Sequence, residues 1–144
     1  MYKKKVLVID HESYFLKIKK IGEETTTNIH FLHASTEKII IEILTQLLEN
    51  KNLNLPDLII IDINFIIIKN IDILTFIKEN ILLQIIPIIV LGENDSSNKL
   101  SNSFENYSNC WLQKPYDDNE FEKVIKSIFF FWFKIAKLPN KNYN

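Results

Sequence analysis

The sequence predicts an α/β protein in which five parallel strands form one doubly wound sheet with helices on both faces. Continuous apolar runs recur at 6–9, 58–61 and 86–91, and runs without polar alternation are typical of parallel strands buried on both faces. Apolar residues at helical spacing fill the segments between these runs. Strict alternation of strand and helix with short connections favours a parallel sheet with right-handed crossovers.

Two weaker strand candidates complete the sheet, IHFLHA at 29–34 and CWL at 110–112. Helices are expected between and after the strands: at 13–20, from Ser35 or Thr36 through Leu48, from Asn70 through Ile81, at 96–105, and from Asp118 or Asn119 through Ile135. The last helix is the clearest, because its apolar residues form one stripe.

Length and composition are those of one ordinary globular domain. We expect it over residues 1–138, followed by a short disordered tail at 139–144. The net charge of −1 argues against bulk nucleic-acid binding, and all 17 basic residues are Lys, so no Arg can clamp a phosphate. The single Cys110 fits a reducing compartment, and no apolar run is long enough to span a bilayer. These features predict a cytoplasmic protein without a membrane partner.

Polar residues follow the apolar strands, and in such sheets the functional crevice lies outside the carboxyl ends of the strands. The strand ends read Asp10-His11-Glu12, Asp62-Ile63-Asn64, Gly92-Glu93-Asn94 and Gln113-Lys114-Pro115. Each residue alone is an ordinary turn residue. Two carboxylates and one lysine on the same edge of a sheet predict a site for a phosphate or a cation.

Four segments, VLVIDHES, PDLIIIDIN, IPIIVLGEN and WLQKPYDDNEFEKVI, resemble in order the signature segments of response-regulator receiver domains, the CheY-like family. The resemblance runs from about Lys4 to Ile128 and implies the (βα)5 flavodoxin-like fold. The later segments are similar to stand-alone receivers associated with phytochrome-type kinases. The resemblance implies a two-component phosphorelay protein, not an enzyme, whose partner is a sensor histidine kinase or another signalling protein.

The same resemblance assigns roles to the strand-end residues. It implies that Asp62 is the phosphoacceptor, that Lys114 contacts the phosphoryl group, and that Pro115 follows in a cis peptide. It also implies that Asp10, Asp62 and the backbone carbonyl of Asn64 hold Mg²⁺. The chemistry is reasonable, because a carboxylate accepts a phosphoryl group only where the charge of both anions is offset.

His11 stands where the family has its second acid, which normally binds Mg²⁺ directly. Imidazole is a poor ligand for Mg²⁺, so we expect the metal to bind weakly. A histidine hydrogen-bonded within the acidic pocket is the preferred interpretation. Three alternatives stay open: a protonated His11 replacing part of the metal's charge, a Zn²⁺ site of His11 with Asp10 and Asp62, or Glu12 taking the place of the missing acid.

The positions that transmit phosphorylation in the family are also altered. Gly92 replaces the Ser or Thr whose hydroxyl contacts the phosphoryl group, and it reads as a plain turn glycine. Glu93 would repel an aspartyl phosphate. Trp111 takes the place of the rotating aromatic, and we expect it to be a fixed packing residue. In the loop 65–70 three isoleucines should leave apolar surface near the site, while Asn70 can adopt the left-handed conformation.

The last helix carries more apolar residues than one buried stripe needs. Trp132 and Ile135 should face the sheet, which would leave Phe130, Phe131 or Phe133 outside. Clustered exposed aromatics mark interaction surfaces, so we predict a homodimer through this helix, with partner docking as the competing interpretation.

The sequence therefore predicts a single-domain receiver whose phosphorylation at Asp62 is weak or atypical, with Mg²⁺ as its weakened cofactor. The alternative is a pseudo-receiver that works as a protein–protein interaction module without phosphorylation.

Overall fold

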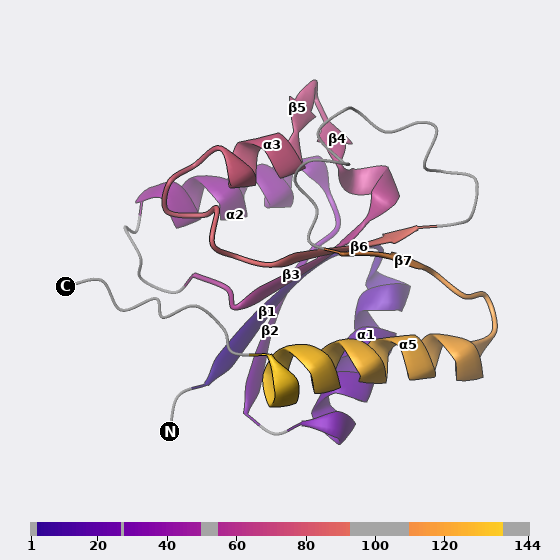
Figure 1. Ribbon diagram of the computed structural model, residues 1–144. Helices are drawn as coiled ribbons and strands as arrows, with labels where there is room; N and C mark the ends of the chain where they lie inside the picture. Colours follow the sequence, from indigo (N-terminus) through magenta and orange to yellow (C-terminus); the bar gives the residue numbers. More distant parts are fainter. Residues whose placement is uncertain (1–2, 27, 50–54, 93–109, 137–144) are drawn as a thin grey trace.

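The computed structural model describes residues 3–26, 28–49, 55–92 and 110–136. Five parallel strands form one sheet in the order β2-β1-β3-β6-β7 (Figure 1). The strands are β1 (Lys4–Ile9), β2 (Ile29–Ala34), β3 (Leu58–Asp62), β6 (Ile88–Gly92) and β7 (Cys110–Gln113). This arrangement confirms the predicted doubly wound α/β fold.

Helices cover both faces of the sheet (Figure 1). The helices are α1 (Glu12–Thr25) and α5 (Asp118–Phe130) on one face, and α2 (Glu37–Glu49) and α3 (Ile73–Lys78) on the other. A π-helical segment, η3 (Phe131–Ile135), continues α5. Across the described ranges, no helix combines the length and apolarity that crossing a bilayer requires.

The two-layer cover explains why the strand sequences do not alternate. Leu7 and Ile9 of β1 belong to the apolar cluster beneath α2 and α3, whereas Val6 and Val8 belong to the cluster beneath α1 and α5. Successive side chains of a strand point to opposite faces of the sheet, and here helices cover both faces. Every residue of the run is therefore buried.

Side-chain caps determine where two helices begin. The Asp72 carboxylate accepts from the backbone N–H of Thr75, so α3 starts at Ile73 and not at the predicted Asn70. The Asp117 carboxylate caps α5 through the N–H of Glu120, one residue before the predicted Asp118. The predicted helix at 96–105 and the tail at 139–144 lie outside the described residues.

A short antiparallel ribbon that the sequence did not predict follows β3. It consists of β4 (Ile67–Ile68) and β5 (Ile71–Asp72), joined by Lys69 and Asn70. Both joining residues have positive φ, 48° and 65°, as a tight two-residue hairpin turn requires. The prediction that Asn70 can adopt the left-handed conformation is confirmed.

The ribbon determines which of the three isoleucines before its turn are exposed. Ile66 and Ile68 are buried in the cluster beneath α2 and α3, and only Ile67 is exposed. The predicted apolar surface of three isoleucines is therefore wrong for two of them, because ribbon pairing turns alternate side chains inward.

The π-helical turn rotates the apolar stripe at the end of α5. Phe129 is fully buried, and Phe133 stacks against it with ring centroids 5.9 Å apart. Phe130 and Phe131 are about half exposed, and Ile135 is 60% exposed. The predicted exposure of Phe130 and Phe131 is confirmed. The predictions that Phe133 is exposed and that Ile135 faces the sheet are wrong, because a π turn inserts an extra residue into the helical period.

We predict that Phe129→Ala lowers the free energy of unfolding by about 3–5 kcal/mol, the usual cost of deleting a buried aromatic ring. Denaturant titration followed by circular dichroism measures this loss. Leu16→Ala is the control at an exposed apolar position of α1, and its effect should stay within about 0.5 kcal/mol. Equal losses in the two variants would contradict the assignment of Phe129 to the core.

Candidate functional site

The order of the strands reverses between β1 and β3, and this is where two carboxylates lie. Ile9 of β1 is in register with Ile61 of β3, so the next residues, Asp10 and Asp62, stand side by side at the edge of the sheet. Crevices outside strand ends at such a reversal are the usual binding sites of open α/β sheets. The predicted pairing of the two acids is therefore present.

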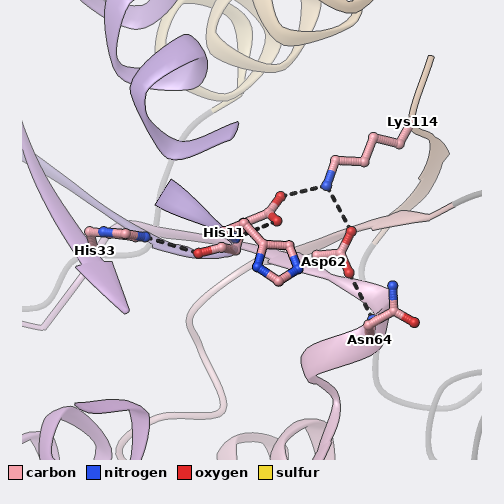
Figure 2. Close-up of polar contacts among 6 residues, drawn as sticks. His11, His33, Asp62, Asn64 and Lys114 are labelled. Carbon is pink, nitrogen blue, oxygen red and sulfur yellow. Dashed lines mark hydrogen bonds and ion pairs between the residues drawn. The ribbon is translucent and has the colours of Figure 1, made fainter. Parts of the chain in front are cut away.

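Lys114 joins the two acids. Its Nζ lies 2.7 Å from Asp10 Oδ2 and 2.8 Å from Asp62 Oδ2. Figure 2 marks the ion pair between Lys114 and Asp62 with a dashed line. All three residues are at most 6% exposed. The backbone N–H of Lys114 donates to the carbonyl of Gly92, which extends the pairing of β7 with β6 by one residue and brings the side chain over the acids.

The second oxygen of each carboxylate also has a partner. Asp10 Oδ1 accepts the backbone N–H of His11 at 2.6 Å, and Asp62 Oδ1 accepts that of Asn64 at 2.9 Å (Figure 2). Asn64 belongs to η1 (Ile63–Phe65), a single 3₁₀ turn that begins at the end of β3. Buried carboxylates with each oxygen bonded are held in one orientation.

Burial raises the pKa of the Asp10 carboxyl, and the negative charge of Asp62 raises it further. The hydrogen bond and the positive charge of Lys114, together with the N–H of His11, act in the opposite direction. Removal from water is the largest of these effects, so Asp10 resists ionisation more than an exposed aspartate does.

The His11 ring does not complete a metal site. It is exposed and packs edge-on against Phe65, with ring centroids 5.2 Å apart. Over the described parts of the chain, no three His, Cys, Asp or Glu side chains are grouped to hold a metal ion. Glu12 is exposed at the first turn of α1. Neither the Zn²⁺ alternative nor the replacement by Glu12 therefore has support in the geometry.

A second histidine, His33, contacts the backbone of Asp10, and the sequence did not predict it as a site residue. His33 of β2 bonds through Nε2 to the backbone carbonyl of Asp10 at 2.9 Å (Figure 2), and its ring stacks on Phe15 at 4.2 Å. A carbonyl only accepts, so Nε2 is the protonated nitrogen. Its place in the strand beside β1 is the signal that could have identified it.

Gly92 is a packing glycine rather than the predicted turn glycine. It ends β6 without positive φ, and a Cβ there would lie 3.0–3.1 Å from the Ile63 side chain. Any side chain at this position would therefore be tight against Ile63. Trp111 is 36% exposed on β7, so it is only partly packed. Glu93 lies outside the described residues.

The predicted cis peptide before Pro115 is wrong, because the described residues contain no cis peptide bond. The trans form of an X–Pro bond is intrinsically favoured by about 0.5–1 kcal/mol. The trans peptide still allows the Lys114 side chain to reach both carboxylates.

The donor atoms at the site fit a hard divalent cation. Carboxylate oxygens of Asp10 and Asp62, with the Asn64 carbonyl nearby in sequence, are the kind that Mg²⁺ and Mn²⁺ prefer. The two Oδ2 atoms are engaged by Lys114, and a third acid is missing at His11. The residues present therefore include donors of the kind that such a cation prefers.

Comparisons with known proteins agree with the fold. Over 91 residues, 63% of this chain, the sequence is 31% identical to the response regulator Rcp1 of Synechocystis. It is 25% identical over 86 residues to a probable methanogenesis regulatory protein, FilR2, of Methanothrix harundinacea. The matched segments span 62% and 56% of those relatives. No protein-family model matches the chain.

Solved structures of the same fold cover nearly the whole chain. A phosphorylated cyanobacterial phytochrome response regulator, RcpA, superposes with a TM-score of 0.80 over 96% of this chain and 100% of its own, at 24% identity. The Mn²⁺-bound form of response regulator Rcp1 gives 0.79 over 95% and 99%, also at 24% identity. This chain therefore has the fold of these response regulators and is similar in sequence to one of them, Rcp1.

The raised pKa of Asp10 predicts an unusual dependence of stability on pH. A carboxyl whose pKa is higher in the folded state binds more protons there, so it costs stability as the pH rises above the ordinary aspartate value of 3.8. Asp10→Asn removes this cost. We expect the stability of Asp10→Asn relative to the natural chain to increase from pH 3.5 towards neutrality, as measured by urea titration across that range. A difference that is independent of pH would contradict the raised pKa.

Proposed function

We propose that this receiver domain accepts a phosphoryl group on Asp62 and works as a response regulator in two-component signalling. The observation that carries the proposal is the buried Lys114 ammonium between Asp62 and Asp10. An Asp62 oxygen would attack phosphorus of an acyl phosphate or a phosphohistidine, the donor's P–O or P–N bond would break, and the mixed anhydride would remain on Asp62. Lys114 would offset the added negative charge.

A divalent cation would be held by Asp10, Asp62 and the carbonyl of Asn64, and it would supply the positive charge that phosphoryl transfer needs. The loss of an acid at His11 supports weak binding of Mg²⁺ and therefore slow phosphorylation. The Mn²⁺-bound form of Rcp1 among the structural neighbours supports this class of metal. The domain thus serves as a phosphoacceptor for a sensor histidine kinase or another signalling protein, not as an enzyme in its own right.

Acetyl phosphate with millimolar Mg²⁺ or Mn²⁺ tests the proposal, with intact-mass spectrometry as the readout. We expect slow addition of one phosphoryl group, which Asp62→Asn abolishes and the exposed control Asp118→Asn retains. His11→Asp restores the missing acid and should raise the rate at least about tenfold, equivalent to about 1.4 kcal/mol of barrier.

Absence of labelling in both the natural chain and His11→Asp would contradict phosphorylation at Asp62. The chain would then be the pseudo-receiver that signals by association alone. Labelling that survives Asp62→Asn would place the acceptor elsewhere and equally refute the proposal.

We also propose that the domain forms a homodimer through the exposed aromatic face of Phe130, Phe131 and Ile135 at the end of α5. Three large apolar side chains within six positions exceed what scattered surface exposure explains. Light scattering with sedimentation should show a dimer at tens of micromolar that Phe130→Ser with Phe131→Ser converts to a monomer. The exposed Lys134→Ser is the matched control. A natural chain that stays monomeric at high concentration would refute the dimer.

A further inference from the structure

The ammonium of Lys114 has a third neighbour besides the two carboxylates. Its Nζ lies 3.5 Å from the centroid of the Tyr14 ring, on the first turns of α1. Cations within about 6 Å of an aromatic face are attracted by the ring quadrupole, most strongly where water is excluded. Lys114 is 6% exposed, so this contact is a desolvated one. The ammonium is thus enclosed by Asp10, Asp62 and an aromatic ring.

The Tyr14 ring is itself held by the contact between α1 and α5. Phe121 of α5 packs against it with ring centroids 5.5 Å apart and an interplanar angle of 51°. Lys17 lies with its Nζ 5.4 Å from the same ring and is fixed by an ion pair of 3.0 Å to Asp118 of α5. The position of the ring over Lys114 therefore depends on helix packing that lies outside the acidic pocket.

We propose that Tyr14 is a positioning residue that keeps the Lys114 ammonium bridging Asp10 and Asp62. In that position the lysine competes with a divalent cation for the same carboxylate oxygens. Tyr14 therefore sets how readily the site exchanges its own lysine for a metal ion. This inference goes beyond the proposed phosphorylation and holds whether or not Asp62 is ever phosphorylated.

The competition follows from the atoms that Lys114 engages. A metal that binds Asp10 and Asp62 through Oδ2 must displace Nζ from both, at 2.7 and 2.8 Å. A lysine on a flexible four-carbon stem can swing away, unless another contact favours the bridging position. The Tyr14 ring is such a contact, and it stabilises the ammonium only where it already lies. Loss of the ring weakens the competitor while leaving every proposed metal donor in place.

Two measurements on the full chain test the proposal. Electron paramagnetic resonance of free Mn²⁺ gives the affinity of the site. Lysine-selective NMR reports the ε-methylene and ammonium signals of Lys114, which Lys114→Met assigns. In the natural chain, the ring should shift the Lys114 methylene signals upfield, and the buried ammonium should exchange slowly with water.

Tyr14→Leu should bind Mn²⁺ up to about thirtyfold more tightly, which corresponds to the loss of a desolvated cation–π contact. It should also lose the upfield shift of Lys114. Tyr14→Phe keeps the ring and should retain the natural affinity and the shift. Lys123→Gln removes an exposed cation of α5 that pairs with Glu120, and it should leave Lys114 unchanged. Asp62→Asn should abolish Mn²⁺ binding at this site.

A purely structural role for Tyr14 predicts the opposite direction, because a loosened site binds metal more weakly. Unchanged or weaker Mn²⁺ binding by Tyr14→Leu would therefore overturn the proposal. A natural chain without ring-shifted Lys114 signals would also overturn it, and this second measurement decides even if Tyr14→Leu does not fold. Failure of acetyl phosphate labelling, by contrast, would refute only the proposed function.

Discussion

The site depends on one electrostatic constraint: two carboxylates buried on neighbouring strand ends require a cation. Removing a carboxylate from water is costly unless a partner and hydrogen bonds compensate it, and two adjacent carboxylates also repel each other. Lys114 meets this requirement for both Asp10 and Asp62 with one ammonium. It can do so because β6 and β7 follow β3 in the sheet, which brings the end of β7 over the crevice. The strand order therefore brings to the site the cation that the two carboxylates require.

His11 changes the balance of charge in this pocket. Two aspartates and one lysine leave one uncompensated negative charge, whereas a third acid at position 11 would leave two. The metal-free pocket is therefore nearer to neutrality than it would be with an acid there, and its need for a divalent cation is smaller. His11 contributes instead in two ways. Its exposed ring packs against Phe65, and its backbone N–H donates to the Asp10 carboxylate.

The route by which the pocket could influence the surface differs from a hydroxyl switch. Gly92 offers no side chain, and Ile63 fills the space beside it, so an apolar contact replaces a hydrogen-bonding one. The structural connection that does leave the pocket runs from Lys114 to Tyr14 and on to Phe121 of α5. That helix ends in the exposed aromatic face. The Tyr14–Phe121 contact thus connects the acids to the start of α5, and association is proposed at the other end of that helix.

The sequence by itself determined the layered α/β fold, because uninterrupted apolar runs indicate strands that are buried on both faces. It also determined that Asp10, Asp62 and Lys114 meet at one edge of the sheet, because each follows the carboxyl end of a parallel strand. Only the tertiary structure decided which groups surround that ammonium and the Asp10 carbonyl. Tyr14 and His33 reach them through helix packing and strand register, and neither leaves a periodic signal in the chain. The same holds for the trans peptide, the ribbon after β3 and the rotated end of α5. These three features are local in the chain, but apolar periodicity does not specify turn type, peptide isomer or helical register.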